Sequence, residues 1–409
     1  MKGASAINRQ PGVVHTLSWT VIGDGLPRFL TLGLTLYVGR RLGAGSFALY
    51  SLAFAWTQLA WAGVDLGTSS YAVRTIAGRP PRPLETLFEI LGLNTLLALS
   101  IMCVATLITV LLVHDPVLKA TTLAMLLFLP TFALYPDWFL RGSGKLPLLG
   151  AANFAVAGTW AAGILVFGAQ HGPPGFGLAW ALSPLGGVLV FWAMARPSTI
   201  NFRAMISPSR WVTHLRISVL YAIAGLLGNG STPVALTFLR DVTTKSALGS
   251  YALGLQISAA VGAGLWLLLL NLMPRLMREH SWRTQKVAIG GALALGTVGA
   301  GSALILSSSV LRPIVGVSYF GGGIWLAAGL LTICPRSARG IVEALLVAKS
   351  QNRARVMMGM SAIALSVLGG LGALFAHQPA IVAVAYVVGE LSAVAVGFLA
   401  LRRTGLAFS

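Results

Sequence analysis

Eight ionisable residues lie inside long apolar stretches of this 409-residue sequence, or near the ends of those stretches. A charge at the middle of a membrane costs about 2.5 to 3.5 kcal/mol on insertion scales, so such a residue normally faces a partner or a water-filled cavity. Each is therefore a candidate for binding an ion or a charged ligand. The eight are Asp24, Arg28, Asp65, Asp137, Arg336, Arg339, Glu343 and Glu390.

Two of these residues belong to the stretch "GDGLPR" in the first apolar segment. Asp24 and Arg28 stand near the expected centre of the bilayer, and their spacing of four permits an intrahelical ion pair that binds no ligand. The alternative is that both contact substrate. Gly23, Gly25 and Pro27 loosen the helix beside them, which is tolerated where a helix lines a cavity. The stretch therefore predicts a hinge with a charged lining.

A second group follows Pro335, a position prone to kinking. Arg336, Arg339 and Glu343 share one helical face, and Arg339 can pair with Glu343 four residues later. Arg336 then has no partner in its own turn, and its planar guanidinium suits phosphate. The alternative is that Arg336 pairs with an acid in the first half of the chain.

Glu390 and Asn229 are candidates for coupling transport to an ion. Glu390 stands alone in the last apolar segment, where it is either permanently protonated or able to titrate. Asn229 lies in "GNGSTP", where Pro233 predicts a second hinge and an interrupted helix. Its amide either coordinates an ion or bridges two helices.

Asp65 and Asp137 lie toward the ends of their segments. Asp137 precedes Arg141 by four residues, so the two can pair on one helical face. We expect both acids to serve as caps or as interface pairs.

The composition defines the environment of these side chains. The sequence is 56% hydrophobic and 10% charged, with a mean hydropathy of +0.81, against about one quarter charged residues in soluble domains. It is the composition of an integral membrane protein. The net charge of +19 does not indicate nucleic acid, because the basic residues lie in short loops between apolar runs. Cys103 and Cys334 fall inside expected spans. We therefore expect them to pack as small apolar residues and not to form a disulfide or bind a metal.

No motif indicates catalysis. The six histidines are scattered, and the sequence has no HExxH, no phosphate-binding P-loop and no nucleophile elbow. We therefore expect a protein that is not an enzyme, with no catalytic residue, no bound metal and no cofactor.

Twelve apolar segments are long enough to span a bilayer. Twenty Lys and Arg residues fall in segments on one side of the resulting topology and six on the other. This asymmetry places both termini in the cytoplasm. We expect helices near 14–38, 47–72, 86–113, 117–139, 146–168 and 175–196, and again near 216–238, 248–273, 286–310, 318–348, 354–376 and 379–401.

The long basic loop at 196–216 divides the chain nearly in half. Matching stretches recur in the same order on either side of it, such as "GAGSFALYSLAFA" (43–55) and "SALGSYALGLQIS" (246–258). This repetition predicts two six-helix lobes of parallel orientation, 1–205 and 206–409, with a central cavity between them.

Several short stretches carry a resemblance to a known family. They are "GRRLGAGSFALYSLAFA", "DLGTSSYAVR", "DWFLRGSGK" and "ALGSYALGLQ". With these stretches, the chain resembles the polysaccharide transporter family. These are Wzx-type flippases of lipid-linked oligosaccharides, in a larger superfamily with multidrug exporters and the lipid II flippase.

The resemblance implies alternating access in a bacterial inner membrane. The implied substrate is an undecaprenyl-diphosphate-linked oligosaccharide, moved from the cytoplasmic to the periplasmic leaflet for exopolysaccharide or O-antigen synthesis. The implied partners are membrane lipids, a polysaccharide polymerase and a chain-length regulator. Arg28 fits the family's theme of basic cavity residues.

Three other functions are compatible with the sequence. A cation-coupled exporter of drugs or small molecules would favour acids over arginines in its cavity. A membrane-embedded polymerase or acyltransferase would carry a large outer loop. A scaffold would not need charges at mid-membrane. The sequence leaves open the sugar, the coupling ion and the oligomeric state.

Overall fold

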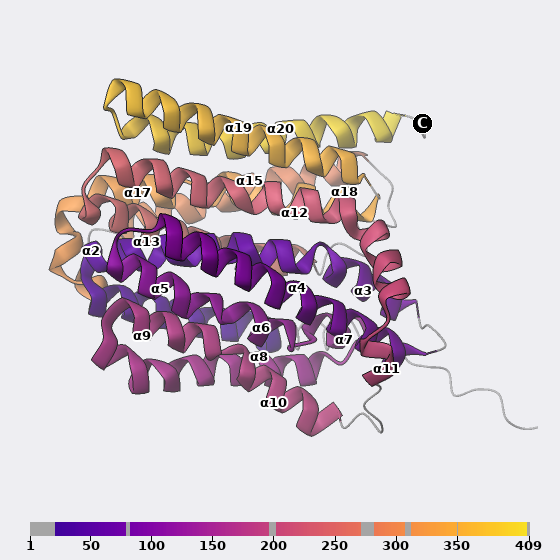
Figure 1. Ribbon diagram of the computed structural model, residues 1–409. Coiled ribbons are helices and arrows are strands. Elements are labelled where there is room, and N and C mark those ends of the chain that lie inside the picture. Colours follow the sequence, from indigo (N-terminus) through magenta and orange to yellow (C-terminus); the bar gives the residue numbers. More distant parts are fainter. Residues whose placement is uncertain are drawn as a thin grey trace, which may run out of the picture.

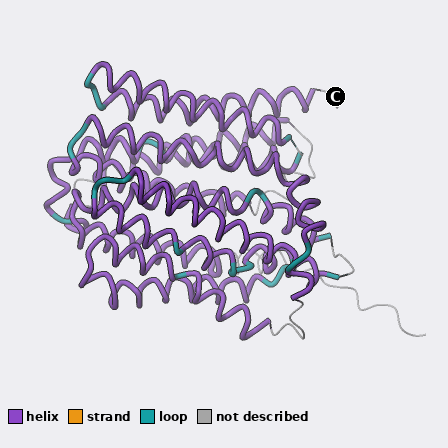
Figure 2. Tube along the Cα trace, viewed as in Figure 1, coloured by secondary structure: helices purple, strands orange, loops and turns teal. Residues whose placement is uncertain are grey.

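The structure is a computed structural model that describes residues 21–78, 82–195, 202–270, 282–306, 312–349 and 351–406. Every regular element in these residues is a helix. The long helices run side by side, with the first half of the chain in one layer of the bundle and the last helices at its opposite edge (Figures 1 and 2). The fold is therefore all-α, as expected.

The last helix of the N-terminal half is short and lies in the linker between the two halves. They are η1 (Val21–Gly25), α2 (Leu26–Asp65), α3 (Thr68–Ala77), α4 (Pro83–Leu112), α5 (Pro116–Leu126), α6 (Phe128–Ala133), α7 (Asp137–Gly142), α8 (Leu146–Gly163), η2 (Ile164–Gly168), α9 (Ala169–Leu182), α10 (Pro184–Ala195) and α11 (Phe202–Met205).

The C-terminal half begins with the longest helix of that half. Its elements are α12 (Pro208–Val242), α13 (Lys245–Leu270), α15 (Trp282–Leu306), α16 (Arg312–Val315), η4 (Val317–Gly322), α17 (Gly323–Leu330), α18 (Ile333–Ala348), α19 (Asn352–Ala376) and α20 (Ala380–Leu406).

Two helices differ from the expected pattern at a glycine or a proline. α2 combines parts of two expected spans, 14–38 and 47–72, joined at Gly43, whose φ of 67° is the left-handed conformation that glycine adopts easily. α12 is continuous through Pro233, so the interruption expected in "GNGSTP" is absent. The prediction of a broken helix there was wrong.

The other two expected irregularities are present in the backbone. Val21–Gly25 forms a π-helical turn before α2 begins. The expected span 318–348 is divided between η4, α17 and α18, and Pro335 lies in the first turn of α18, where its missing N–H costs no helical hydrogen bond.

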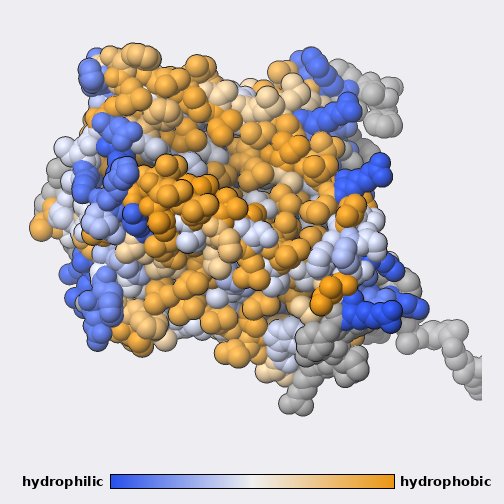
Figure 3. Space-filling model, viewed as in Figure 1, coloured by the Kyte–Doolittle hydropathy of each residue, from blue (hydrophilic) through white to orange (hydrophobic). Residues whose placement is uncertain are grey.

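The molecule is built to lie in a membrane. Among the described residues, eight helical segments are long and apolar enough to cross a bilayer. The surface in Figure 3 is an apolar band with hydrophilic residues gathered at both ends of the helices. The chain is thus a multi-pass membrane protein. The count of twelve spans stays a prediction, since α2 alone combines parts of two expected spans.

The two halves pack together at both ends of the long helices. At the end predicted to face outward, the Tyr319 hydroxyl donates to the Gly39 carbonyl at 3.1 Å, and Gln256 Nε2 donates to Ser51 Oγ at 3.0 Å. At the opposite end, Trp211 Nε1 donates to the Glu89 carbonyl at 3.1 Å. The two halves are therefore in contact at both ends of their interface.

Candidate functional site

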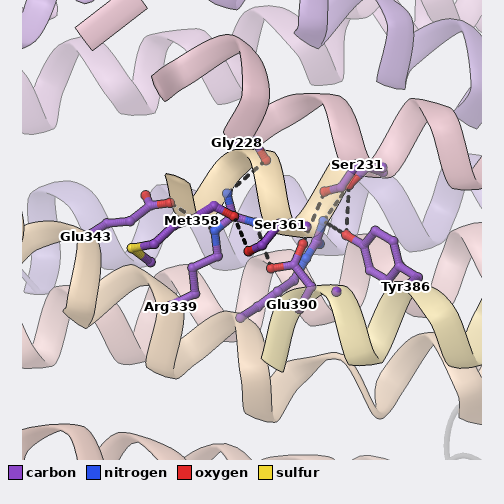
Figure 4. Close-up of polar contacts among 12 residues, drawn as sticks. Gly228, Ser231, Arg339, Glu343, Met358, Ser361, Tyr386 and Glu390 are labelled. Atoms are coloured by element: carbon purple, nitrogen blue, oxygen red, sulfur yellow. Dashed lines mark hydrogen bonds and ion pairs between the residues drawn. The ribbon is translucent and has the colours of Figure 1, made fainter. Parts of the chain in front are cut away.

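The four charged candidates near the C-terminus do come together, inside the C-terminal half. Arg339 of α18 lies between Glu343 of the same helix and Glu390 of α20 (Figure 4), and Arg336 lies one turn earlier on α18. We call these four residues, with Ser231, Thr232 and Tyr386, the charge cluster.

Arg339 is the centre of the charge cluster and is only 7% exposed. Its Nε donates to Glu343 Oε1 at 2.9 Å, which confirms the pairing expected from their spacing. Its Nη1 donates to Glu390 Oε2 at 2.8 Å, and its Nη2 to the Gly228 carbonyl at 3.2 Å. All three nitrogens of the guanidinium are thus hydrogen-bonded.

Glu390 is 2% exposed. The sequence suggested that it stands alone, but in the structure it has partners. Besides Arg339, it accepts a hydrogen bond from Ser231 Oγ at 3.1 Å. The cluster holds two arginines and two glutamates, so its formal charges sum to zero, which lowers the cost of burying them.

Arg336 is also satisfied within its own half. Its Nη2 donates to Thr232 Oγ1 at 2.7 Å and to the Tyr386 hydroxyl at 2.6 Å, and its Nη1 donates to the Leu255 carbonyl at 3.3 Å. It also lies over the Tyr386 ring, 5.7 Å from its centroid. Arg336 therefore pairs with neutral groups instead of the acid of the other half that was the alternative.

The first predicted site lies elsewhere, at the start of α2. Gly23 packs directly on Gly150 of α8, where a Cβ on Gly23 would come within 3.0 Å of the Gly150 Cα. Asn153 Nδ2 donates to the Gly23 carbonyl at 3.3 Å. Pro27 is buried and Arg28 is half-buried. The glycine thus serves a close approach of two helices, and the contacts of Asp24 lie outside the described side chains.

A cavity of about 150 Å³ lies between the two halves. It is smaller than the roughly 300 to 1,000 Å³ of typical ligand sites, so it suits a small part of a larger ligand. We call it the interface pocket. Its lining comes from α2, Gly67, α12 and α19: Gln58, Trp61, Ala62, Asp65, Gly67, Tyr221, Gly225, Asn229 and Arg355.

Arg355 differs from the arginines of the charge cluster. Its guanidinium lies over the Tyr221 ring, 5.6 Å from the centroid. Its Nε and Nη1 atoms are buried without a hydrogen-bond partner among the described residues. A buried N–H of a cation without an acceptor is costly, so this side chain is prepared to receive an anion.

The sequence analysis missed Arg355 because it counted as one of many basic loop residues. A signal was present, since Arg353 and Arg355 stand in the first turn of α19. Positive charge is unfavourable at the N-terminus of a helix, because the helix dipole is positive there. Residues that break such a local rule are often found at functional sites.

Two of the predicted residues line the interface pocket with Arg355. Asp65 Oδ1 accepts from the Ser69 backbone N–H at 3.0 Å, which caps α3. Asn229 is exposed on the pocket face of α12, and its Nδ2 donates to the Gly225 carbonyl at 2.9 Å.

The remaining expected pair is confirmed away from the pocket. Arg141 Nε and Asp137 Oδ2 are 3.2 Å apart.

The fold is shared with solved structures of membrane transporters. The structure matches an inward-facing multidrug resistance MATE family transporter of the MOP superfamily with a TM-score of 0.70 and 16% identity, covering 97% of this chain and 99% of that one. It matches the lipid II flippase MurJ in an inward closed conformation with a TM-score of 0.68 and 13% identity, covering 95% and 90%.

A third match is a MOP superfamily transporter from Pyrococcus furiosus, described as having a binding pocket of reverse polarity. Its TM-score is 0.63 at 16% identity, with 97% and 95% of the chains covered. At these identities the likeness shows the fold. No match was found among curated protein sequences.

The sequence itself gives the family. The model of a family described as polysaccharide biosynthesis protein matches residues 13–278, which is more than half of the chain. The protein belongs to this family, and it has the fold of the MOP superfamily transporters.

Proposed function

We propose that this protein is a flippase for undecaprenyl-diphosphate-linked oligosaccharides in a bacterial inner membrane. It moves them from the cytoplasmic to the periplasmic leaflet, for exopolysaccharide or O-antigen synthesis. Membership of the polysaccharide biosynthesis protein family supports the pathway, and the fold shared with transporters, among them a lipid II flippase, supports the activity.

The observation that carries the proposal is Arg355 in the interface pocket. A diphosphate needs a cation that is not already neutralised, in a place that both halves line. Arg355 offers two buried donor atoms there, held over Tyr221. The arginines of the charge cluster are hydrogen-bonded inside one half, so we assign them to holding that half together.

The remaining cavity candidates keep a place in this proposal. Arg28 and Asp24 belong to the element beside α8 that would flex as the halves separate, with Gly23, Gly25 and Pro27 as its hinge. Asn229 lies on the pocket face of α12, where an ion or a sugar would meet it.

The positions of the contacts between the halves support alternating access. Contacts lie at both ends of the interface, with the interface pocket between them. Parting the halves at one end or the other exposes Arg355 to one leaflet at a time. An inside-negative potential is worth about 2.3 kcal/mol per charge per 100 mV, and it drives an anionic substrate outward.

The test is complementation of a deletion strain, with lipid-linked repeat units and surface polysaccharide as readouts. We expect Arg355→Ala to abolish surface polysaccharide and to accumulate undecaprenyl-linked units on the inner leaflet. Arg353→Ala is the matched control, because Arg353 is an exposed arginine in the same helical turn. Surface polysaccharide at the normal level in the Arg355→Ala strain contradicts the proposal.

A further inference from the structure

The interface pocket contains more than a phosphate needs. Besides Arg355, its lining includes a carboxyl group, two amides and an indole, which belong to Asp65, Gln58, Asn229 and Trp61. Carboxylates and amides are the groups that hydrogen-bond sugar hydroxyls, and an aromatic face packs on the C–H face of a sugar ring.

Trp61 is held rigidly. Its ring meets Phe132 edge to face at 4.5 Å between centroids and Phe128 at 6.0 Å. A rigid aromatic surface loses little side-chain entropy when a ligand packs on it. The residue is therefore built as a platform, and the cavity lies along it.

Asp65 has acceptor capacity left over. A carboxylate offers about four lone-pair positions. One oxygen accepts from the Ser69 N–H to cap α3, and the side chain still lines the pocket. The contact with Ser69 holds the carboxyl group in place in the wall of the cavity.

We propose that the interface pocket binds a glycosyl phosphate, the junction between the diphosphate and the first sugar of the substrate. Arg355 of the C-terminal half takes the phosphate, while Asp65 and Trp61 of the N-terminal half take the sugar ring. This inference rests on the proposed flippase function and adds recognition of the first sugar by the N-terminal half. The volume of about 150 Å³ suits this junction alone, and the rest of the oligosaccharide lies outside the pocket.

The experiment measures binding of three small anions to the purified full-length protein by isothermal titration calorimetry. The probes are glucose 1-phosphate, glycerol 1-phosphate and inorganic phosphate. Glycerol 1-phosphate stands for a phospholipid headgroup, which shares the phosphate but has no sugar ring. We expect glucose 1-phosphate to bind about tenfold more tightly than the other two, the gain of one or two hydrogen bonds and a ring contact.

Variants assign the two parts of the site. Arg355→Ala should lose binding of all three probes. Asp65→Asn, which keeps an acceptor for Ser69, and Trp61→Phe should each reduce the preference for glucose 1-phosphate to about twofold or less and leave inorganic phosphate unchanged. Trp56→Phe is the control, because Trp56 is an exposed tryptophan of α2 outside the pocket.

The outcomes separate this inference from the flippase function. Equal affinity for glucose 1-phosphate and glycerol 1-phosphate overturns the sugar site and makes the pocket a headgroup site. An unchanged preference in both Asp65→Asn and Trp61→Phe also overturns it. Either result leaves export in the complementation assay untouched, whereas normal export by Arg355→Ala contradicts the flippase assignment.

Discussion

The charge cluster and the interface pocket contain the same kinds of side chain, but these side chains have different roles in the two regions. In the charge cluster, Arg339 has an acceptor for every guanidinium nitrogen, and Glu390 is almost fully buried. In the interface pocket, Arg355 has two buried nitrogens without acceptors among the described residues, beside a cavity. An arginine inside a membrane protein thus indicates a binding site only when its partners are missing.

The largest effect expected is on stability, at the charge cluster. Arg339→Ala should lower the free energy of unfolding by about 3 to 5 kcal/mol, because it leaves Glu390 as an uncompensated buried charge. Thermal or denaturant unfolding in detergent measures this loss. Arg355→Ala is the comparison and should lower the free energy of unfolding by about 1 kcal/mol or less, since the contact that it loses is the one with the Tyr221 ring. Equal losses in both variants would remove the distinction between the two regions.

A second test concerns the ionic contact between the halves at the end predicted to face the cytoplasm. Glu89 is buried and accepts from His214 at 3.1 Å, with Arg210 at 3.6 Å. Glu89→Ala should make the closed contact between the two halves at this end less favourable by about 1 to 3 kcal/mol. Cysteine accessibility at Ser218→Cys, a buried position one helical turn after His214 on α12, should increase severalfold in a background without Cys103 and Cys334. Accessibility unchanged from the parent would show that this contact does not hold the halves together.

A smaller effect is expected for Glu343, the exposed member of the charge cluster. Its side chain is 34% exposed, and Glu390 still neutralises Arg339 when Glu343 is replaced. Glu343→Gln should therefore cost about 1 kcal/mol or less in the same unfolding assay. A loss as large as that of Arg339→Ala would mean that the three charges act as one unit.

The smallest effect is expected at the loop between α4 and α5. The backbone N–H of Leu118, and then Lys245 of the other half, lower the pKa of Asp115. A carboxyl with a lowered pKa stabilises the fold above its ordinary pKa of about 3.9, and this contribution is lost as the pH falls through the lowered value. Asp115→Asn keeps the helix cap, so it should cost less than about 1 kcal/mol at pH 7. The difference from wild type should vanish as the pH falls through the lowered pKa of Asp115, and a difference that grows in acid would contradict the assignment.

Local spacing predicted part of this molecule. The pairs Arg339 with Glu343 and Asp137 with Arg141 were predictable, because a separation of four residues fixes the geometry on a helix. The all-helical membrane fold followed from hydropathy in the same way.

Contacts distant in sequence were not predictable from spacing. Glu390 seemed isolated because its partner Arg339 lies 51 residues away on another helix. Arg355 seemed to be a loop cation because nothing in its neighbourhood shows that α2 and α12 close a pocket over it. The continuity of α12 through Pro233 also depends on packing that a single sequence does not display.

The most direct test of the account is translocation by the purified protein in proteoliposomes. A polyprenyl-diphosphate-linked sugar is placed in the bilayer, and its exposure on each leaflet is followed with a lectin that cannot cross the membrane. The account predicts that wild type and Arg353→Ala equilibrate the lipid between leaflets and that Arg355→Ala does not. Translocation by Arg355→Ala at the wild-type rate would contradict the claim that this arginine binds the substrate's phosphate.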